Sequence, residues 1–209
     1  LDANIRPLFE EKGRLRVKFG PVRVEESKEA TGVVVTVPVQ DGDAFQFGSV
    51  RFQGRSQLPE KDLTRLAAPL ESGAPANFAL VLGALSNLER LYKRNGFLRV
   101  RAFADRSVDD QKKTVDLVLR IQEGEQFRLR ELTIKGIDIN AQAAVRKRWA
   151  IPRGQPFDDS YPDVFILRIQ EEAMFDQLAK ITHRVTIDEQ SRMVDVELSF
   201  VAAPPPKTR

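Results

Sequence analysis

The chain has 209 residues, of which 42% are hydrophobic and 30% are charged. This length suits two or three compact domains, and the apolar content lets each of them bury a core. The net charge is only +3 with both signs interspersed, and the pI near 9.3 reflects a small basic excess, which does not point to nucleic acid as a partner. The absence of cysteine excludes disulfides, thiol catalysis and cysteine-ligated zinc.

No apolar run approaches the roughly 20 residues that a membrane-spanning helix needs. The first residues contain no basic segment followed by an apolar one. Any export signal is therefore expected to have been removed or to lie upstream.

An internal repeat of roughly 80 residues organises the chain. Its landmarks lie 82 residues apart: Gly42 and Gly124, Phe45 and Phe127, Gly54 and Gly136. The sequence VDLVL at 115–119 also returns as VDVEL at 194–198. The repeat predicts a partial domain at 1–42 (the C-terminal half of one), complete domains at 43–124 and 125–203, and an extended tail at 204–209.

In chain order, the partial domain begins with the end of a helix that carries Ile5, Leu8 and Phe9. Two strands are expected next, over 15–24 and 33–39. The second of them contains Pro38, which cannot donate a hydrogen bond to a central strand ladder. We therefore expect Pro38 either to lie past the last paired residue or to distort the domain.

The complete domain begins with a strand pattern over 44–53, which Gly54 ends. Pro59 stands at a helix start, and apolar residues recur at helical spacing as far as Leu70. After a break, Asn77 is suited to cap a second helix that Asn95-Gly96 terminates. The residues expected on the buried face of that helix are Phe78, Leu82, Leu85, Leu88 and Tyr92.

Two alternating strands close the domain, at 97–105 and 115–122. In the second, the residues expected to face the core are Val115, Leu117, Leu119 and Ile121. The last domain repeats the order, with strands at 127–135, 180–188 and 193–201 and helices near 140–150 and 160–174. The sequence thus predicts an α+β fold of tandem small β-α-α-β-β domains, each a three-stranded mixed sheet covered on one face by two helices.

The residues at the turns resemble those of a known family. In order, they are Gly54, Leu70-Glu71-Ser72-Gly73, Tyr92-Lys93-Arg94-Asn95-Gly96-Phe97 and Ile121-Gln122-Glu123-Gly124. This series resembles the POTRA (polypeptide-transport-associated) domain, also described as the surface antigen variable number repeat. The glycines expected to be structural turn residues are Gly54, Gly73, Gly96, Gly124, Gly136 and Gly154. The last domain departs from the pattern at Met174-Phe175-Asp176 and at Ala202-Ala203.

No residue pattern indicates catalysis, a metal or a cofactor. His183 is the only histidine, and no serine or aspartate pairing around it suggests a triad. The pairs Glu10-Glu11, Glu25-Glu26 and Glu171-Glu172 are more typical of solvated faces than of acid–base pairs. Helical spacing turns Val145 and Trp149 inward and leaves the basic residues 146–148 outside. We therefore predict that the chain is not an enzyme.

The resemblance implies a periplasmic polypeptide-binding scaffold at the outer membrane of a Gram-negative-type bacterium. In the family the strand after the second helix is an edge strand, to which an extended peptide can add by β-augmentation. The candidate binding residues are therefore Leu98, Arg99, Val100, Arg101, Ala102, Phe103, Ile181, Thr182, His183, Arg184 and Val185. The alternative is that Arg99, Arg101, His183 and Arg184 are charged guards that keep other strands away.

The partners implied by the resemblance are unfolded outer-membrane β-barrel precursors, accessory lipoproteins and a membrane barrel in the same full-length chain. Nucleic acid is not among them. Two other functions remain open at this stage. One is a module of a secretion pore that recognises a single exported partner, and the other is a structural spacer or cell-division interaction domain.

Overall fold

The computed structural model describes residues 1–26, 31–172 and 178–202. The chain divides into two compact units, Leu1–Leu88 with Ala102–Gln122, and Glu89–Arg101 with Glu123–Arg209. Because this division cuts through helix α3 (Phe78–Arg94), it does not test domain boundaries after residues 42 and 124, which stay a prediction. The tail 204–209 and the departure at residues 174–176 lie outside the described residues.

The N-terminal segment is a short helix followed by a two-stranded ribbon. Helix α1 (Arg6–Glu10) packs Phe9 on Phe19 of β1 (Lys18–Phe19). The ribbon pairs β1 with β4 (Val39–Gln40) and β2 (Arg23–Glu26) with β3 (Val33–Thr36), both antiparallel. Pro38 interrupts one side of the ribbon, since it has no N–H, and its carbonyl accepts from the Gly20 N–H at 2.8 Å. Pro38 thus lies past Thr36, the last paired residue of β3, which is one of the two expected outcomes.

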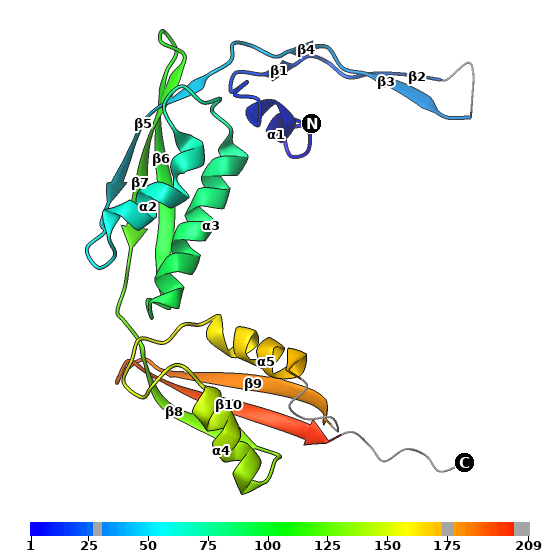
Figure 1. Cartoon of the computed structure of the whole chain (residues 1–209). Helices are drawn as coiled ribbons and strands as arrows, with labels where there is room; N and C mark the ends of the chain where they lie inside the picture. The colour runs from blue at the N-terminus through cyan, green and yellow to red at the C-terminus, as the bar shows by residue number, and fades with distance from the viewer. Residues whose placement is uncertain (27–30, 173–177, 203–209) are drawn as a thin grey trace. The chain divides into compact units, whose positions relative to one another are not determined.

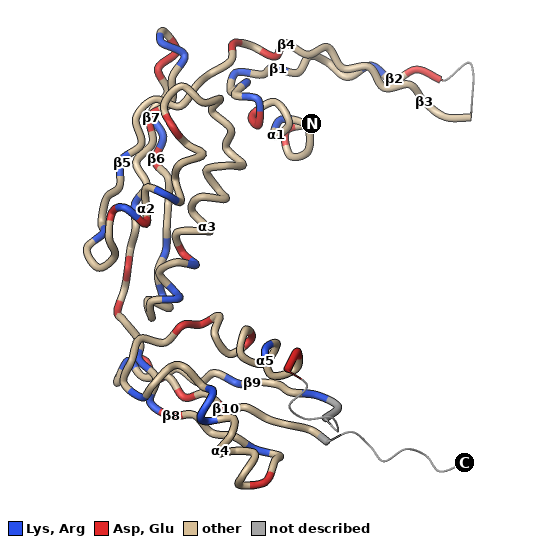
Figure 2. The backbone as a smooth tube through the Cα atoms, in the orientation of Figure 1, with Lys and Arg blue, Asp and Glu red and all other residues tan. Residues whose placement is uncertain are grey.

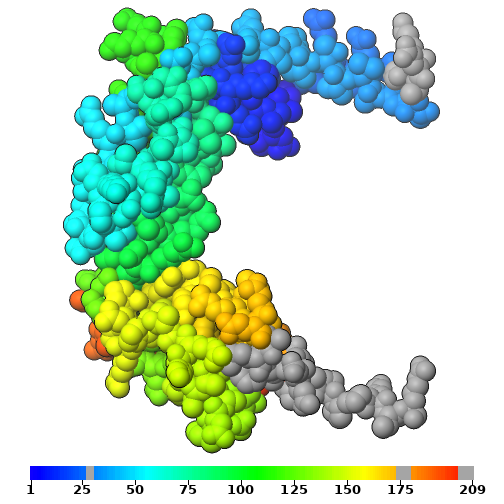
Figure 3. All heavy atoms as spheres, in the orientation of Figure 1, coloured from blue at the N-terminus to red at the C-terminus, as the bar shows by residue number. Residues whose placement is uncertain are grey.

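The charges of the β2–β3 ribbon lie on β2, whereas β3 carries none (Figure 2), and the ribbon extends away from the rest of the first unit (Figure 3). Among the described residues no helix covers it, so its valines are exposed on both faces: Val24, Val33, Val34 and Val35. This segment has the helix, strand and strand order of the second half of a β-α-α-β-β domain.

The first unit contains a three-stranded sheet in the order β5-β7-β6, with helices on one face (Figure 1). The strands are β5 (Gln46–Gln53), β6 (Arg101–Asp109) and β7 (Thr114–Gln122), and β5 runs parallel to β7. The helices are α2 (Glu60–Leu66), a short 3₁₀ turn at Ala68–Leu70, and α3. The four β7 residues expected to face the core are buried, and Asp116 and Arg120 between them are exposed, so the predicted strand phase is confirmed.

Helix α3 begins and ends as predicted, but its buried face is different. The Asn77 side chain accepts from the Ala79 N–H at 2.9 Å, and Gly96 takes a φ of +88° after the last turn. The predicted face was wrong at Leu82, which is 68% exposed. Leu88 and Tyr92 are buried as predicted, and the other buried positions of the helix are Val81 and Ala84. Both sets have helical spacing, and the small side chain of Ala84 favours close packing on the sheet.

The second unit repeats this arrangement with the sheet order β8-β10-β9 (Figure 1). Its strands are β8 (Arg128–Lys135), β9 (Leu178–Asp188) and β10 (Met193–Ala202), with β8 parallel and β9 antiparallel to the central β10. Its helices are α4 (Ile139–Arg148) and α5 (Tyr161–Glu171). As predicted, Val145 is buried and the basic residues after it are exposed. The Trp149 ring packs against Phe165, with ring centroids 5.0 Å apart.

The predicted α+β fold is therefore confirmed. Both mixed sheets place the last strand of the unit in the centre, so the first and second strands in sequence are edges.

Candidate functional site

One edge of each sheet is partly closed by the chain itself. The N–H of Gly73 donates to the Phe47 carbonyl and the Phe47 N–H donates to the Ala74 carbonyl, both at 2.8 Å. In the second unit, Gly154 and Gln155 make the same two bonds with Leu129, at 2.7 and 3.0 Å. The turn between the two helices thus occupies part of the outer side of β5 and of β8.

A β-bulge further modifies the β5 edge. The register between β5 and β7 shifts between Phe47 and Val50. The Asp116 carboxylate accepts from the Ser49 N–H at 2.5 Å and from the Ser49 hydroxyl at 2.8 Å, and these bonds lower the pKa of Asp116. Asp116 lies on the solvent face, as predicted, but it also holds the bulge in place.

The opposite edges, β6 and β9, are the strands that follow the second helix of each unit. Within the described residues, no main-chain hydrogen bond connects the outer side of β9 to another segment, and the same holds for β6 from Phe103 onward. An edge strand with unpaired N–H and C=O groups is a template for a further strand. These two edges are therefore the candidate site.

The second sheet shows which main-chain groups of β9 point outward. The Phe200 carbonyl lies against Gly136, where a Cβ would be only 1.9 Å from its oxygen. Phe200 therefore directs its main-chain groups towards the β8 side. The direction of the main-chain N–H and C=O groups alternates along a strand, so those of Ser199 point towards β9, where Ser199 pairs with Thr182.

The alternation continues across β9. Because Thr182 faces β10, the N–H and C=O groups of His183 and, two residues on, of Val185 point away from the sheet. The two hairpins have turns of equal length, since β6 ends at Asp109 before β7 begins at Thr114, and β9 ends at Asp188 before β10 begins at Met193. The equivalent outward positions in β6 are Ala104 and Arg106.

A groove of about 440 Å³ lies between β6 and α3. Its walls include Leu82 of the helix, which is 68% exposed, and Phe103 of the strand, which is 44% exposed. The Arg106 guanidinium lies 4.9 Å from the centre of the Phe78 ring at one side of this groove. The open β6 edge is therefore bordered by a largely apolar surface.

The predicted β6 edge strand was wrong at its beginning. Leu98, Arg99 and Val100 precede β6 and lie in turns, in which the Leu98 N–H donates to the Gly96 carbonyl at 3.0 Å. The left-handed φ of Gly96 allows this tight reversal, which delays the strand until Arg101. The other predicted residues lie in the edge strands: Arg101, Ala102 and Phe103 in β6, and Ile181, Thr182, His183, Arg184 and Val185 in β9.

The suggested charged guards differ in their surroundings. Arg101 and Arg184 are exposed on the edge strands, whereas Arg99 donates from Nε to Glu189 Oε1 at 2.9 Å. His183 is half-buried, with Nδ1 3.4 Å from Asp163 Oδ1 on α5. The edges thus carry some positive charge, but no continuous row of charged side chains.

Sequence reasoning missed two further grooves, one beside β5 and one beside β8. Their volumes are about 620 Å³ and 460 Å³, and each lies between the edge strand and the first helix of the unit. The groove at β8 is bordered by Arg146, Arg153 and Trp149, whose buried indole N–H has no partner in the described part of the chain. These grooves join residues about 20 positions apart, which periodicity within one element does not reveal.

The described residues contain no group of three or more His, Cys, Asp or Glu side chains placed to hold a metal ion. None of the helices described for this chain is long and apolar enough to cross a membrane.

Tandem β-α-α-β-β units, each with one open sheet edge, define the chain as a modular scaffold of small mixed α+β domains. Residues 45–124 match the family described as "POTRA: Surface antigen variable number repeat". This stretch belongs to the POTRA family, as the turn residues predicted.

Relatives and solved structures agree with this assignment. The chain is 26% identical over 200 residues to a putative outer membrane protein assembly factor of Treponema pallidum, a match that covers 89% of this chain and 24% of the relative. It is 19% identical over 157 residues to the outer membrane protein assembly factor BamA of Neisseria meningitidis serogroup B, covering 75% of this chain and 20% of the relative. The chain thus spans a quarter or less of the length of the curated relatives it matches.

The crystal structure of BamA POTRA3-5 from Haemophilus influenzae superposes with a TM-score of 0.63 at 19% identity. The superposition covers 94% of this chain and 77% of the other. At this identity the likeness establishes the fold of the chain.

Proposed function

We propose that the chain is a non-catalytic periplasmic scaffold that docks unfolded outer-membrane proteins for assembly into the outer membrane. Clients add as an extra strand to β6 and β9. The observation that carries this proposal is the pair of edge strands whose outer main-chain groups, at Ala104 and Arg106 and at His183 and Val185, have no main-chain partner among the residues that the structure describes. The similarity to outer membrane protein assembly factors supports the cellular setting.

The expected affinity follows from the number of main-chain groups. Ala104 and Arg106 each offer one N–H and one C=O, so a client strand can form up to four hydrogen bonds with β6. Each is worth about 0.5–1.5 kcal/mol net, and the loss of translational and rotational freedom on association offsets much of the sum. Binding at one edge should thus be weak and tolerant of client sequence. Two edges in one chain raise the effective concentration for a long client.

The groove beside β6 adds a modest preference. Burial of Leu82 and Phe103 by an apolar client side chain contributes about 25 cal/mol per Å² of apolar surface covered. Outer-membrane strands alternate apolar and polar side chains, so one face of such a strand suits this groove.

The test is a titration with a peptide copied from one strand of an unfolded outer-membrane protein. Ala104→Pro removes an outward N–H, whereas Asp105→Pro removes an N–H that faces β7. We expect Ala104→Pro to weaken binding by about fivefold or more with the fold intact, since one hydrogen bond is lost and the ring obstructs the edge. Asp105→Pro should mainly destabilise the sheet.

Two controls accompany the titration. Amide spectra of each variant check the fold, and Phe103→Ala measures the contribution of a client-facing side chain. Binding that is abolished by Phe103→Ala and indifferent to a correctly folded Ala104→Pro would contradict strand addition. It would favour recognition of client side chains in the groove.

A further inference from the structure

The chain contains two junctions built from the same contacts. At the first, the Phe45 N–H donates to the Gly13 carbonyl at 2.9 Å. At the second, the Phe127 N–H donates to the Gly96 carbonyl at 2.8 Å. Both glycines have left-handed φ, and a Cβ on either would lie 2.5–2.6 Å from the carbonyl oxygen of the same phenylalanine.

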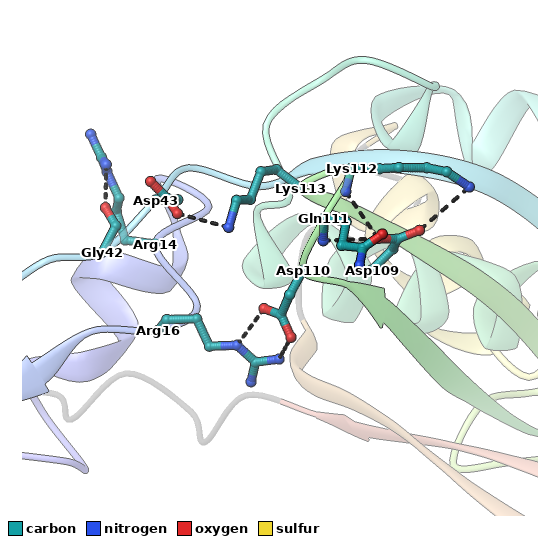
Figure 4. A network of polar contacts seen from close by, with 9 residues as sticks. All are labelled: Arg14, Arg16, Gly42, Asp43, Asp109, Asp110, Gln111, Lys112 and Lys113. Carbon is teal, nitrogen blue, oxygen red and sulfur yellow. Dashed lines mark hydrogen bonds and ion pairs between the residues drawn. The ribbon is translucent and has the colours of Figure 1, made fainter.

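A pair of ion pairs flanks the first junction (Figure 4). Arg16 binds Asp110 with two hydrogen bonds, Nε to Oδ1 at 2.9 Å and Nη2 to Oδ2 at 2.8 Å. Lys113 Nζ lies 2.8 Å from Asp43 Oδ2. Asp110 and Lys113 both belong to the β6–β7 turn, where charges of both signs gather (Figure 2). The turn therefore contributes one anion, Asp110, and one cation, Lys113, and each pairs with a residue of opposite charge outside the turn.

The second junction has the same pattern with different residues. Arg99 binds Glu189, with 2.9 Å between Nε and Oε1, and Arg192 Nη1 lies 3.1 Å from Glu125 Oε2. Glu189 and Arg192 belong to the β9–β10 turn. Where the first junction has aspartate the second has glutamate, and where the first has lysine the second has arginine. The sign of the charge at each equivalent position is therefore the same.

The turns also match in their backbone. Lys113 and Arg192 have φ of 56° and 57°, values that are uncommon for residues other than glycine. In each turn the carbonyl of this residue accepts from the first residue of the neighbouring strand, Gln46 at 2.9 Å and Arg128 at 3.0 Å. Lys113 and Arg192 thus each direct the main-chain carbonyl to the N–H of the neighbouring strand and the charged side chain to the acidic partner.

We infer that the β-hairpin turn of each complete β-α-α-β-β domain is a docking surface for the helix-to-strand turn of the preceding domain and for the linker that follows that domain, held by crossed ion pairs. The inference does not depend on the proposed client binding. All four ion pairs are substantially exposed, with side-chain exposures between 42% and 68%. Exposed pairs are screened by salt, so the junctions open more often as ionic strength rises.

The hydrogen-exchange rates of two amides, measured in the full chain, report on the opening of each junction separately. The Phe45 N–H reports the first junction and the Phe127 N–H reports the second. Amides of Leu119 and Leu198, in the central strands, report whether the domains stay folded. Exchange is compared in low-salt buffer and in roughly 1 M NaCl, where the screening length falls to about 3 Å.

We expect Asp110→Arg to speed exchange at Phe45 by roughly two- to fivefold and to leave Phe127 unchanged. Glu189→Arg should do the reverse. The double variant Arg16→Asp with Asp110→Arg restores the pair with opposite polarity and should return Phe45 towards its original rate. High salt should speed both amides in the unmodified chain.

A matched control is Asp62→Arg, which makes the same charge change at an exposed ion pair with Arg65 on α2. It should leave both junction amides unchanged. If Asp110→Arg also speeds exchange at Leu119, the milder Asp110→Asn replaces it. Failure of the swapped pair to restore Phe45, or equal effects of Asp62→Arg and Asp110→Arg, would overturn the inference.

Discussion

Leu119 lies in the central strand of the first sheet, and its side chain is 0% exposed. It stands beside Phe52 of β5 in the parallel ladder and faces the helices that cover the sheet. Substitution of Leu119 by alanine should therefore destabilise the first unit. The equivalent residue of the second unit, Leu198, is also 0% exposed and provides a second test.

The size of the effect follows from the buried surface. Alanine lacks three carbons of the leucine side chain, and each buried methylene is worth about 0.8 kcal/mol, which gives about 2.4 kcal/mol. The cavity left between sheet and helices adds to this loss, because central strands cannot move to fill it. The expected total is about 2–5 kcal/mol for either leucine.

The assay uses the single tryptophan of the chain, Trp149, which packs in the second unit. Urea unfolding followed by its fluorescence reports the second unit, and amide signals of β7 report the first. Leu198→Ala should lower the midpoint seen by Trp149. Leu119→Ala should lower the midpoint seen in β7.

The control is Val118→Ala, on the opposite face of β7, where the side chain is half-buried. It should cost about 1 kcal/mol or less. Asp116→Ala, which the strand phase alone predicts to be harmless, is a poorer control because Asp116 holds the β5 bulge. Equal losses for Leu119→Ala and Val118→Ala would refute the argument that β7 buries its odd-numbered residues.

Two more predictions concern the turns and the charges of the second unit. Gly136→Ala should destabilise the second unit by about 3 kcal/mol or more, because the new Cβ would meet the Phe200 carbonyl oxygen. Gly154 has a similar φ but open space around it, so Gly154→Ala should cost only about 1–2 kcal/mol. Equal unfolding midpoints in urea for the two variants would contradict this. The hydrogen bonds of Arg130 lower the pKa of Asp195, and those of Ser191 and then Arg130 lower the pKa of Asp188. A carboxylate with a lowered folded pKa stabilises the fold above its unfolded pKa of about 3.9, and this contribution is lost as the pH falls through the folded value. Arg130→Met should therefore weaken the loss of stability below about pH 4, measured by Trp149 fluorescence, and an unchanged pH profile would argue against these pairs.

The fold could be predicted because its signals are local. Strand alternation in β7 and the capping and terminating residues of α3 each act within a few positions. The internal repeat presents similar signals in the second unit, which supports the same assignment. The predicted buried face of α3 was wrong at Leu82, although right at Leu88 and Tyr92, because two overlapping stripes have helical spacing. The choice between Val81 and Leu82 depends on the sheet surface, which the helix sequence does not contain.

The candidate site was predicted only in part. The edge strand β9 lies where expected, but β6 begins late because the turn after Gly96 uses residues 97–100 for reversals. The junction ion pairs join residues that lie far apart in the sequence, such as Arg16 with Asp110, 94 positions apart. Long-range pairing of this kind leaves no local pattern in one sequence.

The most direct test of strand addition is amide exchange along β6 and β9 in the presence of an unfolded outer-membrane protein strand. The account predicts slower exchange at alternate residues, including Ala104 and Arg106 in β6 and the matching His183 and Val185 in β9, because their N–H groups point outward. The intervening Asp105, whose N–H faces β7, should not change. Protection confined to α3, or to the grooves beside β5 and β8, would contradict strand addition at these edges.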